Sequence, residues 1–362
     1  MSPSASALLS FALSRALVIV VALLAISLFP IATPCGQSCH LSSVPILDIA
    51  ARWDGGWYLG IARDGYGHAE GAQTDLAFFP LYPALMRALG ALAGGSDDAY
   101  LAAGVVLSNV ALLVAVVLLA RLVALDHGPA VAASAVALLL VFPTTVILSS
   151  VYAESLFLAC AVAALYFART GRWGWAGLAG MLGALARPFG FLIALALAVE
   201  YVAQRRRHVA GVAAVALPVV AFVSWMAALA LMTGDRFAFF TAQAAYGRRA
   251  GLPTGAVGDL FDPSAYGNPW FIVAFGGLVA ILVVLSWRLL RPSLAAFGTV
   301  FLLASVSTGT LTSFLRYALA VFTAFVALAA LRSPWARRAY VVAASTTAVL
   351  FTAMFALWYW IG

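Results

Sequence analysis

Apolar residues fill this chain in long runs that polar and charged residues interrupt at only a few places. Runs of about 20 apolar residues are typical of transmembrane helices. The pattern predicts membrane spans near residues 8–31, 99–124, 129–148, 150–168, 209–232, 269–289, 294–311, 314–332 and 338–361. The apolar stretch 173–203 contains Arg187-Pro188. Proline removes a helix hydrogen bond and clashes with the preceding turn, so we expect two shorter helices that meet in the membrane.

Two segments between the spans are long and comparatively polar, residues 32–98 and 233–268. Within the first, residues 45–62 and 81–92 predict short amphipathic helices that lie at the membrane interface. We find no pattern typical of a soluble domain. The expected fold class is all-α, a polytopic transmembrane helical bundle with about 9–11 membrane helices, and residues 1–362 are expected to form a single integral membrane domain.

Composition and charge add an orientation to this picture. The chain is 65% hydrophobic and only 9% charged, whereas a soluble protein has about 25% charged residues. All 20 basic residues are arginine. With the N-terminus in the cytoplasm, the cytoplasmic loops hold 11 Arg and two acids, and the opposite face holds six Arg and ten acids. The positive-inside rule therefore predicts that 32–98 and 233–268 are extracytoplasmic.

The first long loop mixes acids, arginines and aromatic residues at the membrane edge. Asp54 lies between Trp53 and two glycines, where a substrate can approach closely, and it is our candidate for a general base that deprotonates an acceptor hydroxyl. The alternative is a helix-capping aspartate. Asp48 and Asp64 are weaker candidates in the same loop. Asp75 is either a second acid or a surface turn residue.

Glu154, Arg187 and Arg316 lie within or at the end of apolar runs, where charge is costly and is usually satisfied by a partner or a cavity. Glu154 is either a wall of a substrate cavity or a buried partner of a structural arginine. Arg187 and Arg316 are suited to phosphate because a guanidinium can donate two parallel hydrogen bonds. Their alternatives are a snorkelling side chain or an ion pair with Glu154.

Five segments resemble the PIG-V family, the GPI mannosyltransferase 2 group and its prokaryotic relatives. They are Arg52–Tyr58 with Ile61–Tyr66, Ala77–Pro83, Phe142-Pro143 with Tyr152–Phe157, Ala186–Gly190, and Ser313–Tyr317. The segments follow the family order along most of the chain. The first pair is specific to the family, and the later ones are weak when taken singly.

The resemblance implies a GT-C type glycosyltransferase that transfers mannose from a polyprenyl-phosphate donor to a lipid or glycan acceptor, with inversion at the sugar carbon. It places an essential acid in the first extracytoplasmic loop, at Asp54. The expected substrate-binding residues are Arg52, Trp53, Trp57, Tyr58, Asp75, Phe79, Tyr82, Tyr152, Glu154, Arg187, Arg316 and Tyr317. The all-arginine usage fits a bacterial relative, for which GPI is not the expected acceptor. We expect no metal or other cofactor, because no Asp-X-Asp pair lies near Asp54.

Three alternatives stay open at the level of sequence. One is a GT-C enzyme that uses another lipid-linked sugar. The second is a lipid or solute transporter whose pathway contains Glu154, Arg187 and Arg316, although this does not explain the acid- and aromatic-rich loop. The third is a non-catalytic partner subunit. In each case we expect a multi-pass protein of the cell membrane that does not bind nucleic acid.

Overall fold

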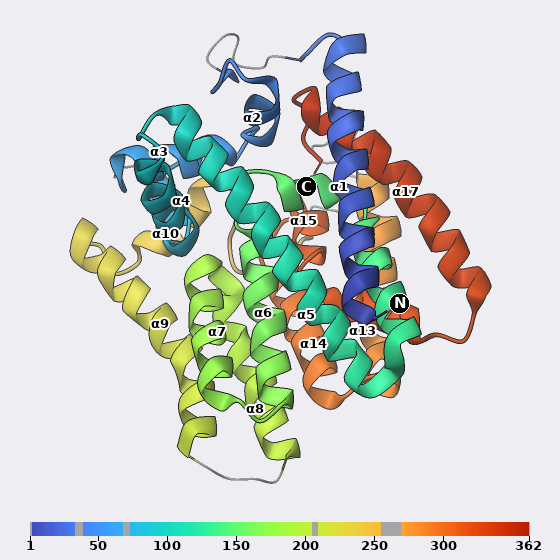
Figure 1. Ribbon diagram of the computed structural model, residues 1–362. Helices are drawn as coiled ribbons and strands as arrows, with labels where there is room; N and C mark the ends of the chain where they lie inside the picture. The colour runs from blue at the N-terminus through green and yellow to red at the C-terminus, as the bar shows by residue number, and fades with distance from the viewer. Residues whose placement is uncertain (1, 33–38, 68–72, 205–208, 255–268, 362) are drawn as a thin grey trace.

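The computed structural model describes residues 2–32, 39–67, 73–204, 209–254 and 269–361, and these form a helical bundle (Figure 1). Five helices are long and apolar enough to cross a membrane. They are α1 (Pro3–Leu28), α5 (Asp97–Leu140), α9 (Val209–Thr233), the helix Pro269–Leu289, which ends with α13 (Gly277–Leu289), and α17 (Pro334–Ala356). The described residues contain no β-strand beyond an isolated bridge between Gly251 and Thr308. The all-α prediction is confirmed.

Shorter apolar helices complete the bundle. They are α6 (Glu154–Arg169), α7 (Trp173–Ala186), α8 (Ile193–Ala203), α14 (Pro292–Val306), α15 (Phe314–Ala318) and α16 (Phe322–Ala330). Helix α6 packs against α5 and α7, and α7 packs against α9. Leucine and valine side chains on the outward faces of α1 and α9 are exposed, for example Leu13 at 64% and Val212 at 58%. Apolar surface of this extent is compatible with lipid but not with water, and the protein is a multi-pass membrane protein.

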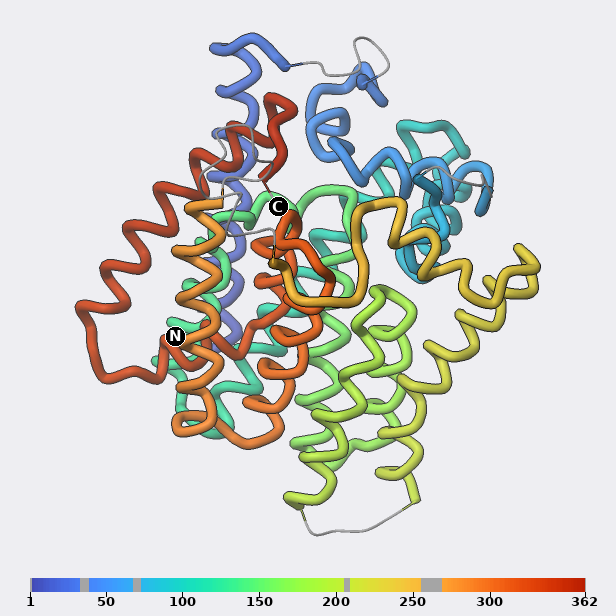
Figure 2. Tube along the Cα trace, turned by 180° about the vertical axis from the view of Figure 1, so that it is seen from behind, coloured from blue at the N-terminus to red at the C-terminus, as the bar shows by residue number. Residues whose placement is uncertain are grey.

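Four short helices from the two long loops gather at one end of the bundle, the upper end in Figure 1. They are α2 (Pro45–Ala50), α3 (Gly55–Asp64), α4 (Leu81–Leu92) and α10 (Ala238–Ala245). The Tyr246 hydroxyl donates to the carbonyl of Thr74 at 3.2 Å, and the Gln243 amide donates to the carbonyl of Ala77 at 3.2 Å. The described parts of the two long loops therefore pack together, and the view from behind shows the same grouping (Figure 2).

The structure corrects the helix predicted over residues 45–62. Two helices, α2 and α3, replace it, because the backbone turns between Ala51 and Asp54. Trp53 has φ of 58°, a left-handed conformation that cannot continue a right-handed helix. The other predicted interfacial helix, residues 81–92, is present as α4.

Breaks in the long helices follow local sequence signals. Helix α5 joins the two spans predicted at 99–124 and 129–148, with a kink at Gly128 and Pro129, and it ends at Leu140. The predicted break at Arg187-Pro188 is confirmed, since it separates α7 from α8. The spans predicted at 314–332 and 338–361 differ from the structure. The first is divided into α15 and α16, and the helix of the second ends at Ala356.

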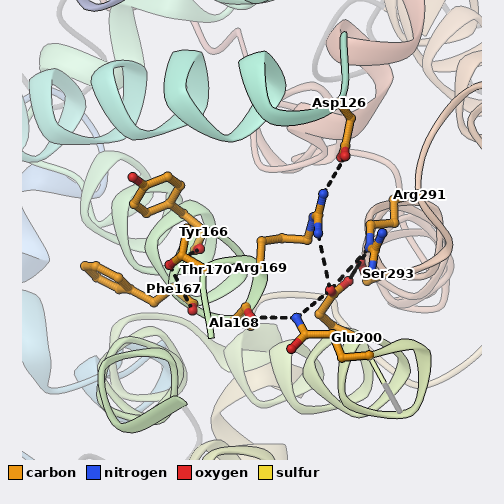
Figure 3. Close-up of polar contacts among 10 residues, drawn as sticks. Asp126, Tyr166, Phe167, Ala168, Arg169, Thr170, Glu200, Arg291 and Ser293 are labelled. Atoms are coloured by element: carbon orange, nitrogen blue, oxygen red, sulfur yellow. Dashed lines mark hydrogen bonds and ion pairs between the residues drawn. The ribbon is translucent and has the colours of Figure 1, made fainter. Parts of the chain in front are cut away.

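An ion-pair network ties four helices together (Figure 3), at the end of the bundle opposite α3 and α4 in Figure 1. The fully buried Glu200 on α8 accepts from Arg291 Nε at 2.9 Å and from the Ser293 hydroxyl at 2.6 Å. Arg169, at the end of α6, pairs with Asp126 and lies 3.8 Å from Glu200. A buried carboxylate needs such partners because desolvation of an unpaired charge is costly. The network joins α5, α6, α8 and the start of α14 at this end.

Candidate active site

A sharp turn between α2 and α3 presents Asp54. The Tyr152 hydroxyl holds this turn, because it donates to the carbonyl of Arg52 at 3.0 Å and accepts from the backbone N–H of Asp54 at 3.1 Å. The turn also contains the left-handed Trp53. Strained backbone of this kind persists only where its surroundings hold it, and it is frequent at functional sites. Asp54 occupies the N-cap position of α3, but its side chain makes no capping hydrogen bond.

The carboxylate of Asp54 belongs instead to a chain of alternating charges. Arg316 on α15 pairs with Asp54, and its Nε lies 3.1 Å from Glu154 Oε1. Arg187, at the break between α7 and α8, lies 2.8 Å from the same oxygen through Nη1. Glu154 is the first residue of α6, where the positive end of the helix dipole favours an anion. Glu154 and Arg316 are buried, whereas the Asp54 side chain is 21% exposed.

Aromatic rings surround these charges. The rings of Tyr58 and Phe78 lie 5.1 Å apart, and Trp57 stacks on Phe78 at 5.9 Å. Arg187 lies over the ring of Tyr317 at 5.0 Å, an arrangement that favours a cation. Burial, together with the nearby charge of Asp54, raises the pKa of the Tyr246 hydroxyl. That hydroxyl is therefore a neutral hydrogen-bond donor at the edge of the site.

Three adjoining cavities meet at this cluster. The central one measures about 50 Å³, room for one or two water molecules, and lies among Asp54, Glu154, Arg187 and Arg316. An outer cavity of about 610 Å³ is lined by Asp54, polar residues and the tryptophans Trp53, Trp57, Trp358 and Trp360. An apolar groove of about 690 Å³ runs from Arg187 and Tyr317 along Phe189, Phe191, Leu192, Phe222, Phe239 and Phe240.

The structure separates the predicted site residues into three groups. Those that line the central cavity are Asp54, Tyr58, Phe79, Glu154, Arg187, Arg316 and Tyr317, and those that line the outer cavity are Trp53 and Trp57. Those that lie behind the walls are Arg52, Tyr82 and Tyr152. Asp75 is in none of the three cavities, and it accepts from the backbone N–H of Gly67 at 2.7 Å.

The side chains behind the walls position those in front. Arg52 is buried, lies 3.2 Å from Asp48, and stacks over Trp358 at 4.8 Å. The Tyr82 ring packs against Tyr58 at 4.9 Å, and its hydroxyl lies 2.7 Å from Ser108 Oγ. These contacts hold the turn that carries Asp54 and the aromatic wall beside it.

Sequence reasoning assigned no role to several residues that the structure brings to this site. Trp358 has φ of 71° and lies 5.7 Å from Trp53, so the chain after α17 turns back into the outer cavity. Arg248 lines the central cavity although only its loop was singled out. Arg15, inside α1, donates to the carbonyl of Thr145 at 3.0 Å and to Ser149 at 2.9 Å, which fixes the segment before Tyr152. Of these three residues, only Arg15 had a signal in the sequence, because it is an arginine within an apolar run.

Comparison with solved structures defines the class of protein. The structure of ArnT from Cupriavidus metallidurans bound to undecaprenyl phosphate matches with a TM-score of 0.53 and 13% sequence identity, over 96% of this chain and 76% of ArnT. The apo structure of the same ArnT matches with a TM-score of 0.52 and 13% identity, over 96% of this chain and 75% of ArnT. The fold is that of the GT-C membrane glycosyltransferases.

A family model for mannosyltransferase (PIG-V) matches residues 8–249, which is more than half of the chain. The chain belongs to this mannosyltransferase family, and it is a membrane glycosyltransferase. Among curated proteins, none matches it. The family supplies what the fold alone does not, an enzymatic class, and it sets aside the transporter and the non-catalytic subunit. The matched range ends before Arg316, which lines the central cavity, and before Trp358 and Trp360, which line the outer one.

Proposed function

We propose that the protein transfers mannose from a polyprenyl-phosphate-mannose donor to a lipid or glycan acceptor on the extracytoplasmic face of the cell membrane, with inversion at the sugar carbon. One observation carries this proposal. A partly exposed carboxylate, Asp54, lies with Arg316 where an apolar groove meets a tryptophan-lined outer cavity. A lipid-linked sugar and a polar acceptor could reach Asp54 from opposite sides.

The donor fits the apolar groove and the charges at its end. Five phenylalanine side chains line the groove, and Arg187 lies where it opens onto the central cavity. A polyprenyl chain would lie along the rings, and its phosphate would reach the arginines. ArnT, which has a similar fold, binds undecaprenyl phosphate, and this supports a lipid-phosphate donor here. Because the central cavity is small, we place the sugar at the junction, extending into the outer cavity.

The acceptor fits the outer cavity. Tryptophan rings stack well on the apolar faces of sugars, and sites of this kind combine aromatic walls with a few polar groups that fix orientation. Here Trp57 and Trp360 supply aromatic walls, and Thr310, Thr312 and Ser313 supply hydroxyl groups. An acceptor hydroxyl in this cavity would lie beside Asp54.

The reaction follows as a single displacement. Asp54 takes the proton from the acceptor hydroxyl, and the oxygen forms a bond to the anomeric carbon. The bond between that carbon and the phosphate oxygen breaks, and the lipid phosphate leaves with the electron pair. Arg187 and Arg316 line the same space and are candidates to stabilise the developing negative charge. Attack from the side opposite the leaving group inverts the sugar carbon.

A reconstituted transfer assay tests the proposal. Purified protein in lipid nanodiscs would receive polyprenyl-phosphate mannose carrying a radioactive sugar, together with extracted membrane acceptors. We expect label to move from the donor to the acceptor fraction, and the Asp54→Asn variant to give none above background. Parallel reactions with polyprenyl-phosphate glucose or arabinose test the sugar. Preferred use of one of these would replace mannose, and no transfer from any lipid-linked sugar would overturn the proposed donor class.

A further inference from the structure

Arg248 follows α10 in the second long loop and has no role in the reaction as described so far. Its guanidinium donates to Gln243 Oε1 at 3.2 Å and to Ser313 Oγ at 3.2 Å. It also lies 5.9 Å from the ring centre of Tyr246 and 5.8 Å from that of Tyr317. Two hydrogen bonds and two rings hold the guanidinium in place between the loop and α15.

The charges around Arg248 are unbalanced. Arg187 pairs with Glu154, and Arg316 pairs with Glu154 and Asp54. Within the part of the chain that the structure describes, Arg248 has only neutral acceptors. The central cavity is therefore lined by three arginines and two carboxylates. A positive charge in a partly buried, largely apolar setting is costly without a counter-charge. Arg248 is therefore suited to bind an anion.

The position of Arg248 identifies the kind of anion. Of the residues that line the three cavities, Arg248 is the one common to all of them. An anion held there would touch the end of the apolar groove, the central charges and the outer cavity at once. A phosphate with a hydrocarbon chain on one oxygen and a sugar on another has this arrangement of groups. Inorganic phosphate would leave the groove empty.

We propose that Arg248 binds the phosphate of the polyprenyl donor and receives its negative charge as the sugar leaves. This inference rests on the proposed function. Arg187 and Arg316 already neutralise Glu154 and Asp54 in the protein without ligand, and they orient these carboxylates. Arg248 can turn its donors from Gln243 and Ser313, which are neutral, to a phosphate at a smaller cost than breaking an ion pair. Charge-assisted hydrogen bonds to phosphate are stronger than neutral ones.

Binding of undecaprenyl phosphate tests the inference without an acceptor. The protein in nanodiscs would be titrated with undecaprenyl phosphate and, separately, with undecaprenol, which has the chain but no phosphate. We expect the wild type to prefer the phosphate, and Arg248→Gln to bind it about 10–100-fold more weakly, as loss of charged hydrogen bonds predicts. Binding of undecaprenol should not change. Arg248→Lys should restore part of the affinity, since it keeps the charge and loses the planar donor pair.

Arg236→Gln is the matched control, because Arg236 is an exposed arginine of the same loop and lines none of the three cavities. It should bind undecaprenyl phosphate like the wild type. Full affinity in Arg248→Gln would overturn the inference alone. If the wild type bound undecaprenyl phosphate no better than undecaprenol, both the inference and the proposed function would be overturned. If phosphatidylglycerol or inorganic phosphate displaced undecaprenyl phosphate equally well, the site would bind anions in general, and this too would overturn the inference.

Discussion

The proposed chemistry at the scale of single residues depends on the Asp54 carboxylate. We predict that Asp54→Asn lowers the transfer rate about 10²–10⁴-fold, because the side chain keeps its size but cannot accept a proton. The thermal midpoint should change little, since Arg316 keeps its contact with Glu154. Asp64→Asn is the matched control in the same loop, where Asp64 forms an exposed pair with Arg63, and it should remain active. Near-normal transfer by Asp54→Asn would give the role of base to another acid.

Arg316 contacts both carboxylates of the site, and its replacement tests whether it acts on the substrate. We predict that Arg316→Ala transfers sugar much more slowly than the wild type, and that Arg316→Lys is partly active because it retains the charge. The loss should appear as weaker donor binding or slower turnover, with acceptor binding nearly unchanged. If Arg316→Ala mainly lowers the thermal midpoint, and adding Glu154→Gln restores both stability and transfer, then the residue is structural.

Sequence alone could select most residues of this site, and it offered ion pairs of Arg187 and Arg316 with Glu154 as alternatives, which the structure contains. It did not foresee the pairing of Arg316 with the catalytic candidate Asp54. A charged residue in an apolar run is rare and costly, which is why Glu154, Arg187 and Arg316 stood out. Arg316 meets Asp54 across 262 positions of the chain, and no local pattern encodes such a contact. Trp358 and Arg248 were missed for the same reason. Aromatic and basic residues at the end of a span or in a loop are common membrane anchors, and only tertiary packing brings these two into the site.

The break between α7 and α8 is the element that places Arg187, and Gly190 makes it possible. A Cβ atom at Gly190 would lie 2.0 Å from the carbonyl oxygen of Gly183. We predict that Gly190→Ala destabilises the protein by about 1–3 kcal/mol or more, because the two backbones must separate. It should also lower transfer, since displacement of a catalytic group by about 1 Å can cost roughly 10²-fold.

Thermal unfolding and the transfer assay measure both effects of Gly190→Ala. Gly174→Ala is the control, since it lies in α7 and a Cβ there meets nothing within 4 Å. If Gly190→Ala behaves like Gly174→Ala, the close backbone contact does not position Arg187. At this scale, the sequence predicted the break at proline, whose effect on a helix is local. It did not predict the break at Trp53, because nothing in a tryptophan favours a left-handed backbone.

The whole molecule has two ends of different character, and charge predicts which end faces the cytoplasm. Ser96 and Arg172 are exposed. Ser96 directly precedes α5, which begins at the end of the bundle that holds α3 and α4, and Arg172 directly precedes α7, which begins at the opposite end (Figure 1). We predict that a membrane-impermeant thiol reagent added to intact cells labels Ser96→Cys and spares Arg172→Cys. Background should be low, since Cys160 is buried and Cys39 is disulfide-bonded. The reverse pattern would place the active site in the cytoplasm and contradict the proposed face.

Much of the molecule at this scale could be predicted from hydropathy, because a bilayer requires apolar helices of a certain length. The approximate positions of the five long helices and of the two long loops followed from that requirement, whereas the span predicted at 314–332 is divided in the structure. The packing partners of each helix could not be predicted, because the sequences of apolar helices contain few signals that show which faces are in contact. Glu200 illustrates this, since it joins α8 to α6 and α14 through a network that its position in a loop predicted to be cytoplasmic did not reveal.

The pairing of Asp54 with Arg316 has a kinetic consequence on the proposed function. In the ligand-free protein, the guanidinium occupies a carboxylate oxygen that would accept the proton. A donor phosphate held by Arg248 would lie in the same central cavity as Arg316 and would compete with Asp54 for its guanidinium. The freed oxygen could then accept the proton, so catalysis would begin only when the lipid is in place. Substrates would then bind in a fixed order, donor before acceptor. An acceptor analogue should accordingly inhibit uncompetitively with respect to the donor.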